Sequence, residues 1–426
     1  MQDGHLDFMQ NKLVGILGIG LIILAAYALS RDRKAIRWKS VIMGLILQVG
    51  FAVAILGIPS LGVPGVLRFV FDGLNFFVSG LVDFTSEGSK FLFGPLAEIK
   101  DPWGFIFAFR ALPTIVFFSA LMSGLYHLGI LQRVVKVFAF IMQKTMKTSG
   151  AETLSGAANI FMGQTEAPLL IKPFIPKMTK SEIYCVMVGG MCTIAAGVEG
   201  AYIGLLKGRI ADIAGHLLTA STMGAIGGLI ISKIIYPEKE KSVTAGKVEF
   251  HQEKVDSNVV EAISRGASDG IMLALNVAAM LIVFVSLIAI IDGVVGRIGV
   301  AMHLSEPISF AFLIGKLCQP VAWLMGVPWN EAAQVGRVIG EKIVINEFVG
   351  YIDLSREAAH LSDRTVLIAS YALCGFANFS SIGIQIGGIG GMAHEKKATI
   401  AQLGFLAVVG GNLACFLAAA VAGLLY

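Results

Sequence analysis

The chain has 426 residues, of which 56% are hydrophobic and only 15% are charged, and its mean hydropathy is +0.77. Soluble domains carry about 25% charged residues, so this composition excludes an ordinary soluble protein. The formal net charge of +4 is small and gives no reason to expect a nucleic-acid polymer as a partner. The five cysteines have no CxxC pair and lie in apolar runs, which favours buried hydrophobic residues over a metal site. We therefore expect an all-α polytopic membrane protein.

Apolar runs of spanning length alternate with short charged loops along the chain. A helix needs about 20 residues to cross the hydrocarbon core. About eight spans are expected, over residues 13–30, 41–57, 105–131, 181–206, 212–236, 271–291, 366–391 and 399–425. The basic loops 31–39 and 133–147 belong in the cytoplasm by the positive-inside rule, which puts both termini outside. The polar start, residues 1–7, argues against a cleavable signal sequence.

A first polar stretch lies between two apolar runs at residues 159–168, NIFMGQTEAP. It places an amide, a hydroxyl and a carboxylate side by side at Gln164, Thr165 and Glu166, between a glycine and a proline that favour a helix break. Irregular backbone at membrane depth is tolerated only where it lines a cavity or is buried in protein. We therefore predict a re-entrant hairpin over 150–178 that enters and leaves on the cytoplasmic side.

A second stretch, residues 344–351 (VINEFVGY), again places an amide and a carboxylate, Asn346 and Glu347, in apolar surroundings. It predicts another re-entrant hairpin over 331–352. The loop after it is rich in acids, whereas lysines follow the first hairpin, so the two hairpins are expected to enter from opposite sides. Their tips would then bring two carboxylates face to face.

The two halves of the chain share one layout: a hairpin with an acidic tip, a broken span, then an unbroken span. Gly197 follows Glu166 by 31 positions, and Asn378 follows Glu347 by 31 positions. This pattern predicts an inverted repeat with its site near the midplane, where broken helices meet. The predicted organisation is N-terminal spans and interfacial helices over 1–102, a first repeat over 103–236, a charged cytoplasmic loop over 237–264 and a second repeat over 265–426.

The polar residues at the breaks supply amides, hydroxyls and two carboxylates: Gln164, Thr165, Glu166, Glu347, Asn378, Ser380 and Ser381. With no Lys or Arg among them, this set suits a neutral solute with several hydroxyls and a hydrogen-bonding ring, such as a sugar bearing a base. Phe376 could press against a ring face. The alternative is polar contact between helices. That alternative is weakest for the carboxylates, whose burial costs roughly 2.5 kcal/mol or more.

The breaks also suggest a coupling ion. Unwound carbonyls coordinate Na⁺, and Asn159 and Thr193 add side-chain oxygens near the first hairpin. Proton coupling through Glu166 or Glu347 is the competing interpretation. Glu199 is a further acid at membrane depth that either faces the cavity or pairs across helices. The sequence contains neither HExxH nor GxSxG, and an enzyme is not expected. A passive channel for polar solutes and an intramembrane hydrolase are the alternatives to a transporter.

Several separated motifs resemble the concentrative nucleoside transporter family. The family pattern G-x-K-x3-N-E-F-V-A-aromatic is matched by Gly340, Lys342, Asn346, Glu347, Phe348, Val349 and Tyr351. Gly350 stands where the family has alanine, and GQTEAP at 163–168 resembles the first-hairpin motif. Further blocks that resemble the family are 107–129, 320–329 and 374–383. The likeness runs from about residue 90 to the end, and the first two spans resemble those of bacterial members.

The resemblance implies a sodium-driven secondary active importer of nucleosides in a bacterial inner membrane. It implies a homotrimer among membrane lipids, with a transport domain that slides against a fixed scaffold. The implied substrate residues are Gln164, Thr165 and Glu166 near the nucleobase, Glu347, Asn378 and Ser381 at the ribose hydroxyls, and Val198 and Phe376 packing on the substrate. The implied sodium ligands are the side chains of Asn159 and Thr193 and the carbonyls of Met162 and Ile194. Glu199 departs from the family, where an apolar residue is expected.

Overall fold

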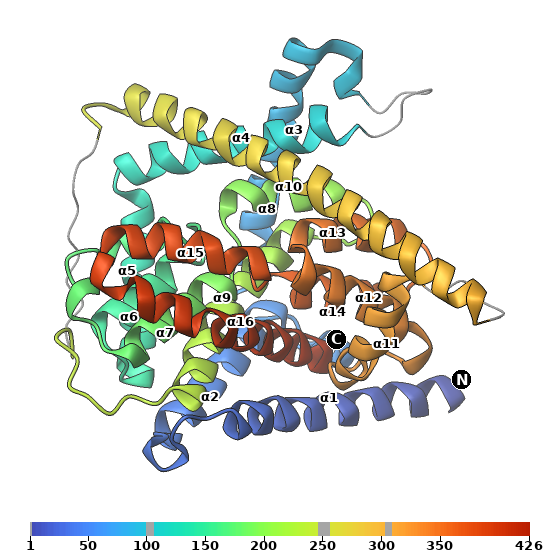
Figure 1. Cartoon of the computed structure of the whole chain (residues 1–426), viewed down its shortest axis with the longest axis horizontal. Helices are drawn as coiled ribbons and strands as arrows, with labels where there is room; N and C mark the ends of the chain where they lie inside the picture. Colours follow the sequence, from blue (N-terminus) through green and yellow to red (C-terminus); the bar gives the residue numbers. More distant parts are fainter. Residues whose placement is uncertain (1, 99–105, 246–255, 303–308) are drawn as a thin grey trace.

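The computed structural model describes residues 2–98, 106–245, 256–302 and 309–426, and these residues form helices without a β-sheet (Figure 1). The first half contains α1 (Gln2–Ala28), α2 (Trp38–Leu56), α3 (Arg68–Phe93), α4 (Phe107–His127), α5 (Ile130–Met146), α6 (Gly150–Ala158), α7 (Lys180–Met191), α8 (Ala196–Leu206) and α9 (Ile213–Ile235). The second half contains α10 (Val259–Ala301), α11 (Phe310–Leu324), α12 (Trp329–Val344), α13 (Glu347–Glu357), α14 (Asp363–Leu373), α15 (Phe379–Met392) and α16 (Lys397–Leu425).

Six helical segments in the described part of the chain are long and apolar enough to cross a membrane. They are Trp38–Leu56, Phe107–His127, Lys180–Leu206, Ile213–Ile235, Val259–Ala301 and His394–Leu425. Two further spans were expected from the sequence. One corresponds to the shorter apolar helix Lys12–Ala28, and the other is divided between α14 and α15, each too short to cross alone. The chain is thus an all-α polytopic membrane protein.

Helices α9 and α16 are largely buried and pack against each other and against α7. Small residues allow this close approach. A Cβ added at Gly227 of α9 would lie 3.2 Å from the carbonyl oxygen of Ala414 in α16. One added at Gly410 of α16 would lie only 2.5 Å from the Tyr184 hydroxyl of α7. Glycine at such contacts is typical of helices that associate without a hydrophobic driving force between them. In Figure 1, α10 runs beside α4 along one side of this core and α1 along the opposite side.

The first hairpin begins with α6, which Ser149 and Glu152 start with a capping box. After Ala158 the chain forms an irregular tip, and its returning limb consists of the short 3₁₀ helices Ala167–Ile171 and Ile175–Lys177. Prolines in the first turns of both explain this difference from an ordinary helical hairpin, since proline lacks the N–H that an α-helix interior requires. The second hairpin is longer than expected, because its limbs α12 and α13 together extend from Trp329 to Glu357.

Both predicted helix breaks are present. The first separates Met191 at the end of α7 from Ala196 at the start of α8. The second separates Leu373 at the end of α14 from Phe379 at the start of α15, and Asn378 caps α15 with its side chain. These breaks follow the two hairpin tips in the same order, which confirms the layout that the sequence indicated.

Two regions differ from the expected boundaries. Within residues 60–102, where surface and interfacial helices were expected, residues 68–93 form one long helix, α3, which carries a row of exposed phenylalanines: Phe69, Phe76, Phe77, Phe84 and Phe91. The helix α10 begins at Val259, so residues 259–264 are helical rather than part of the charged loop. The side chain of Asn258 explains this start, because it accepts a hydrogen bond from the backbone N–H of Glu261 and caps the helix.

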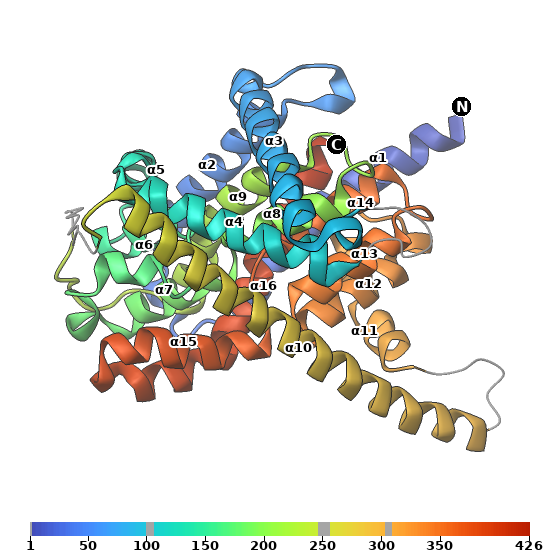
Figure 2. The same cartoon turned by 90° about the horizontal axis from the view of Figure 1, so that it is seen from above.

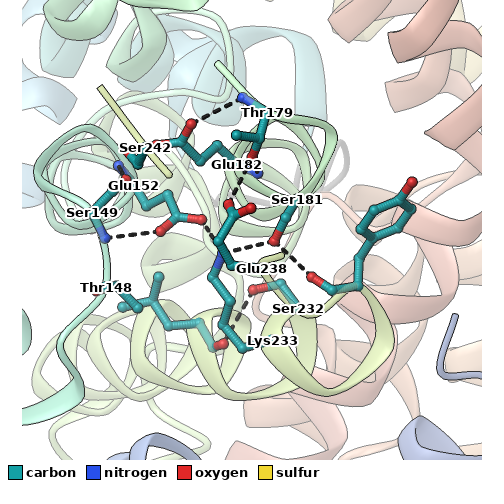
Figure 3. Close-up of polar contacts among 12 residues, drawn as sticks. Thr148, Ser149, Glu152, Thr179, Ser181, Glu182, Ser232, Lys233, Glu238 and Ser242 are labelled. Atoms are coloured by element: carbon teal, nitrogen blue, oxygen red, sulfur yellow. Dashed lines mark hydrogen bonds and ion pairs between the residues drawn. The ribbon is translucent and has the colours of Figure 1, made fainter. Parts of the chain in front are cut away.

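A buried polar cluster joins the starts of α6 and α7 to the end of α9 (Figure 3). Lys233 of α9 forms an ion pair with Glu152 of α6 and donates a hydrogen bond of 2.9 Å to Ser181 of α7. Residues 237–245, which we call the strap, lie across this cluster. Ser242 of the strap donates a hydrogen bond of 2.5 Å to Glu182 of α7. The strap is therefore bonded to the protein rather than being a free linker.

Candidate functional site

Gln164 at the tip of the first hairpin is held by α15. Its amide nitrogen donates a hydrogen bond of 3.0 Å to the hydroxyl of Ser381, and the side chain is only 6% exposed. Its amide oxygen accepts a hydrogen bond of 3.1 Å from the amide of Gln385. Gln385 also donates a hydrogen bond of 2.9 Å to the carbonyl of Met187 in α7. The tip is therefore fixed against the helix that follows the second break.

The next two residues of the tip face different surroundings. Thr165 packs on α15, where a Cβ added at Gly388 would lie 2.6 Å from its methyl carbon. The carboxylate of Glu166 accepts a hydrogen bond of 3.1 Å from the backbone N–H of Gly163, which stabilises the turn. Its side chain is exposed and lines a cavity of about 310 Å³.

This cavity lies between the first hairpin, α4, the start of α8 and α10. Its lining is largely apolar, with a polar group that includes Ser119, Ser123, Glu166, Lys172, Arg265 and Asp269. A concave, mainly apolar cavity of roughly 300 Å³ with a few polar groups is typical of a small-molecule site. Met162, Ala195 and Gly197 also line it, so the cavity reaches both the first hairpin and the first helix break.

Glu347 at the tip of the second hairpin is 5% exposed and accepts a hydrogen bond on each oxygen. The hydroxyl of Tyr202 in α8 donates at 2.8 Å, and the amide of Asn378 donates at 3.0 Å. Glu347 is also the first residue of α13, where the helix dipole favours a negative charge. Since a carboxylate has about four acceptor positions, this geometry leaves capacity for two hydroxyl donors.

Asn378 connects the second hairpin to α15. While its nitrogen donates to Glu347, its oxygen accepts hydrogen bonds from the backbone N–H of Ser381 at 2.9 Å and from the hydroxyl of Ser380 at 2.7 Å. Because Ser381 is also bonded to Gln164, a chain of hydrogen bonds joins the two hairpin tips. The tips thus meet at the start of α15.

The expectation that the two tip carboxylates face each other needs correction. Glu166 lines the cavity beside α4 and α10, whereas Glu347 is not among the residues that line it and is bonded to Tyr202 and Asn378 instead. The physical reason is the local turn, since the bond from Gly163 directs the Glu166 carboxylate back over its own loop. The two tips are connected through α15, which Gln164 reaches at Ser381 and Glu347 reaches at Asn378.

The remaining predicted packing residues lie near these groups. Val198 is buried in the first turns of α8, and Phe376 is half-buried in the second break. The backbone N–H of Phe376 donates to the carbonyl of Thr193 at 3.3 Å, so the two breaks are in direct contact. This contact brings the segments on which Val198 and Phe376 lie close together.

The residues predicted to bind sodium surround a set of buried oxygens without partners. Asn159 is fully buried, and neither its amide oxygen nor its amide nitrogen has a hydrogen-bond partner in the described part of the chain. The hydroxyl of Ser155, one helical turn earlier, is also buried and unpartnered there. Thr193 donates to the carbonyl of Gly189 at 3.0 Å, and a Cβ added at Gly189 would lie 3.6 Å from the Asn159 amide.

This donor set fits sodium. Hydroxyl, amide and carbonyl oxygens are the hard ligands that such an ion takes at a helix break. Met162 and Ile194, whose carbonyls the resemblance implied, lie on the two segments that meet here. The backbone N–H of Ala196 donates to the carbonyl of Phe161 at 3.2 Å, and that of Ile194 donates to the hydroxyl of Ser221 at 3.3 Å. No cluster of His, Cys, Asp or Glu in the described residues provides a transition-metal site.

Sequence reasoning missed the residues that hold this site together. Tyr202, Gln385 and Ser155 are polar residues inside apolar helices, where a supporting role cannot be distinguished from ordinary contact between helices. Lys342 was noted only as part of a motif. It is fully buried, and its ammonium donates a hydrogen bond of 2.8 Å to the carbonyl of Ala372 at the end of α14. It therefore satisfies one of the carbonyls that the second break exposes.

Comparison with known families and proteins gives matches over nearly the whole chain. Residues 17–96 match the family description "Na+ dependent nucleoside transporter N-terminus", 108–209 match "Nucleoside recognition" and 216–423 match "Na+ dependent nucleoside transporter C-terminus". An uncharacterized transporter of Haemophilus influenzae is 43% identical over 97% of this chain and 98% of its own length. The nucleoside permease NupC of Helicobacter pylori is 37% identical over 97% of this chain and 98% of its own.

Solved structures show the same fold. The inward-facing, substrate-bound structure of CNTnw superposes with a TM-score of 0.88, at 38% identity, over 98% of both chains. A variant of CNTnw in an outward-facing state gives a TM-score of 0.90, at 38% identity, over 98% of both chains. The fold and site thus define a secondary transporter of small solutes. The chain belongs to the concentrative nucleoside transporter family, and its coupling ion is sodium.

Proposed function

We propose that this protein imports nucleosides across the inner membrane of a bacterium, driven by the inward sodium gradient. The observation that carries the proposal is the chain of hydrogen bonds from Gln164 through Ser381 and Asn378 to Glu347. It supports a site in which amide groups face a nucleobase and a carboxylate with two spare acceptor positions faces the ribose hydroxyls. Mouse sodium/nucleoside cotransporter 1 is 38% identical over 98% of this chain and 64% of its own length.

The proposed roles follow from the groups available. Gln164 and Thr165 would bind the base, with Glu166 beside it, while Val198 and Phe376 would pack on the substrate. Glu347, Asn378 and Ser381 would hold the ribose. Sodium would bind beside the first hairpin through Asn159 and Thr193 and the carbonyls of Met162 and Ile194. Since the two breaks touch at Thr193 and Phe376, an ion there would stiffen the backbone that carries the substrate residues.

The proposed mechanism is alternating access by movement of the hairpin-containing part of the protein as one unit. The cluster of Figure 3 supports it, since Lys233 ties α6, α7 and α9 together. We further propose that the protein is a homotrimer and that α4 and α10, which pack against each other, belong to the part that stays fixed. Both termini would lie outside. No catalytic role is proposed for any residue.

The test is uptake of labelled uridine by proteoliposomes that contain the purified protein. Uptake should be saturable, should exceed the external concentration and should require an inward sodium gradient. A passive channel would equilibrate uridine without accumulation, and a hydrolase would release free base. Uptake that ignores the sodium gradient would overturn the proposed use of the ion.

A further inference from the structure

Gln385 is a buried amide of α15 to which the proposed site gives no contact with the substrate. Its side chain is fully buried between α7 and the tip of the first hairpin. Its amide nitrogen donates two hydrogen bonds, one of 2.9 Å to the backbone carbonyl of Met187 and one of 3.1 Å to the amide oxygen of Gln164. Its own oxygen has no hydrogen-bond partner in the described part of the chain. Gln385 therefore acts there only as a donor.

The backbone carbonyl of Met187 fixes the orientation of this amide. A carbonyl has no proton and can only accept a hydrogen bond, so the group of Gln385 that faces it must be the nitrogen. If the Gln385 amide were turned over, its oxygen would lie against the carbonyl of Met187 and against the oxygen of Gln164. Both would be contacts between acceptors. Gln385 therefore keeps its orientation even though its own oxygen is left unpaired.

The orientation of Gln385 in turn determines that of Gln164. Since Gln385 presents a donor, Gln164 must present its amide oxygen to it, and the Gln164 nitrogen then faces the hydroxyl of Ser381 at 3.0 Å. The Ser381 oxygen accepts this bond, so the proton of the hydroxyl is not used. Among the described residues, no hydrogen bond is donated by that hydroxyl. The proton of Ser381 thus remains available for a ligand.

Tight packing by α7 keeps the two amides in place. Gly190 of α7 lies against both of them. A Cβ added at Gly190 would be 2.7 Å from the Cβ of Gln164 and 3.1 Å from the amide nitrogen of Gln385. The absence of a side chain at this position lets α7 approach closely, which brings the carbonyl of Met187, one turn earlier, within reach of Gln385.

A free proton on Ser381 complements the carboxylate of Glu347. Glu347 can only accept hydrogen bonds, and the Asn378 side chain is bonded both to this carboxylate and to the backbone N–H of Ser381. A sugar hydroxyl that binds between the two residues can donate to Glu347 and accept from Ser381 at the same time. If the Gln164 amide were turned over, its oxygen would take the proton of Ser381, and the sugar would lose this donor.

We propose that Gln385 is a positioning residue for nucleoside recognition, which fixes the direction of the hydrogen bonds between Met187 and Ser381 and so makes Ser381 a donor to the ribose. This inference rests on the proposed function, in which Ser381 and Glu347 hold the ribose. It adds that recognition of the sugar depends on a residue that does not touch it. Because the groups form one chain, loss of Gln385 acts on ribose recognition through Ser381.

The experiment measures competition by 2′- and 3′-deoxyuridine against uptake of labelled uridine in proteoliposomes, at a fixed inward sodium gradient. The variants are Gln385→Met, Ser381→Ala and the two combined, because methionine is unbranched like glutamine but has no amide. Equilibrium binding of labelled uridine to the protein in detergent repeats the comparison for a variant that folds without transporting.

Gln48→Met is the matched control. Gln48 is also fully buried, donates a hydrogen bond of 2.8 Å to the backbone carbonyl of Met223, and has an amide oxygen without a partner in the described residues. It is not bonded to any residue of the proposed site. A change that appears in Gln385→Met but not in Gln48→Met is therefore specific to the chain of hydrogen bonds.

Gln385→Met should raise the KM for uridine and lower the discrimination against the deoxy analogues, each by about three- to tenfold, which corresponds to one neutral hydrogen bond. Its maximal rate should change little, since the lost interaction is one of binding. Ser381→Ala should lower the discrimination to a similar extent, and the double variant should lower it no further than Ser381→Ala alone. Gln48→Met should leave the KM and the discrimination unchanged.

Gly190→Ala gives a second, independent measurement if Gln385→Met does not fold. It removes no hydrogen-bonding group, but its Cβ displaces both amides. It should lower the discrimination against the deoxy analogues in the unaltered background and have no such effect when Ser381→Ala is already present.

Discrimination in Gln385→Met equal to that of the unaltered chain would overturn the inference and leave the proposed function intact. The inference also fails if the double variant loses more discrimination than Ser381→Ala, since Gln385 would then act by another route. The same loss in Gln48→Met would assign the effect to any buried amide and overturn it as well. Absence of sodium-driven uridine uptake by the unaltered chain would instead refute the proposed function.

Discussion

Gln164 and Ser381 are 217 positions apart in the chain, yet the amide of one donates a hydrogen bond of 3.0 Å to the hydroxyl of the other. The bond is buried and joins the first hairpin to the helix that carries Asn378. Each half of the chain thus contributes residues to the same small polar cluster.

Replacing Gln164 by Leu should weaken nucleoside uptake by raising KM. The change removes both the donor to Ser381 and the acceptor for Gln385, and a lost hydrogen bond costs about 0.5–1.5 kcal/mol. We expect a rise of about tenfold, measured as initial rates of uridine uptake. Gln402→Leu, on the exposed side of α16, is the control and should be unaffected. An unchanged KM in Gln164→Leu would contradict the proposed role at the base.

Glu347→Gln should reduce the preference for an intact ribose. The carboxylate only accepts hydrogen bonds, whereas an amide offers one acceptor oxygen and two donors. A hydrogen bond to a charged group is worth about 1.5–3 kcal/mol, so discrimination between uridine and its 2′- and 3′-deoxy analogues should fall by at least about tenfold. The measurement is competition of the deoxy analogues against labelled uridine uptake. Tyr202→Phe should reduce this discrimination less, because it removes only one hydrogen-bond donor to Glu347. Unaltered competition would show that the ribose binds elsewhere.

Asn159→Ala should raise the sodium concentration for half-maximal uptake by about tenfold, as expected for the loss of about 1.4 kcal/mol of ion binding. The side chain is fully buried without a hydrogen-bond partner in the described structure, so its removal breaks no hydrogen bond within the protein. Nucleoside selectivity should change little. Sodium titrations of uridine uptake test this, with Asn330→Ala on the exposed surface of α12 as the control. Equal sodium curves for the two variants would exclude Asn159 as a ligand.

Lys233→Met should destabilise the protein by about 3–5 kcal/mol, because it leaves the carboxylate of Glu152 buried without its cation. The Glu152 side chain is only 2% exposed and the Lys233 side chain 11%. Adding Glu152→Gln to Lys233→Met should recover much of the loss, since the uncompensated charge is then removed. Thermal unfolding in detergent measures both variants. If the double variant is no more stable than Lys233→Met, the unpaired charge of Glu152 is not the reason for the lost stability.

Acid should weaken the start of α10. The guanidinium of Arg265 binds both oxygens of Asp256, at 2.8 and 2.7 Å, and lowers the pKa of that carboxyl below its ordinary value. The pKa of the Asp256 carboxyl is thus lower in the folded protein than in the unfolded chain, where it is about 3.9, so the charged carboxylate stabilises the fold above that pH. This stabilisation is lost as the pH falls through the folded-state pKa. Asp256→Asn should therefore flatten the fall of Tm below about pH 4, while Glu395→Gln should not. If the Tm of Asp256→Asn still falls steeply below about pH 4, other titrating groups cause the loss of stability in acid.

The sequence predicted the breaks because they depend on local chemistry. Asn346 and Asn378 both stand before apolar runs, and both cap the helices that follow. The two hairpins and the order of broken and unbroken spans followed from the same signals. The orientation of the tip side chains did not, since a backbone N–H at Gly163 decides where the Glu166 carboxylate points.

The supporting residues could not be predicted because their partners are distant in sequence. Tyr202 is 145 positions from Glu347, and nothing near either residue indicates their contact. The 3₁₀ conformation of the returning limb of the first hairpin was not predicted, although its prolines at 168, 173 and 176 offered a usable signal against an α-helix. The length of α10 was underestimated because its first turns are charged and were assigned to the loop.

The 43 residues of α10 make a rod of about 65 Å, roughly twice the hydrocarbon thickness of a bilayer. Figure 2 shows it crossing the molecule obliquely, with its C-terminal part extending beyond the other helices. Such a rod fits its surroundings only at a steep slant or with its ends in water. The acyl-chain length of the surrounding lipid therefore sets the tilt of α10 in the bilayer. Lipid thickness can influence the protein through this tilt, without any polar contact.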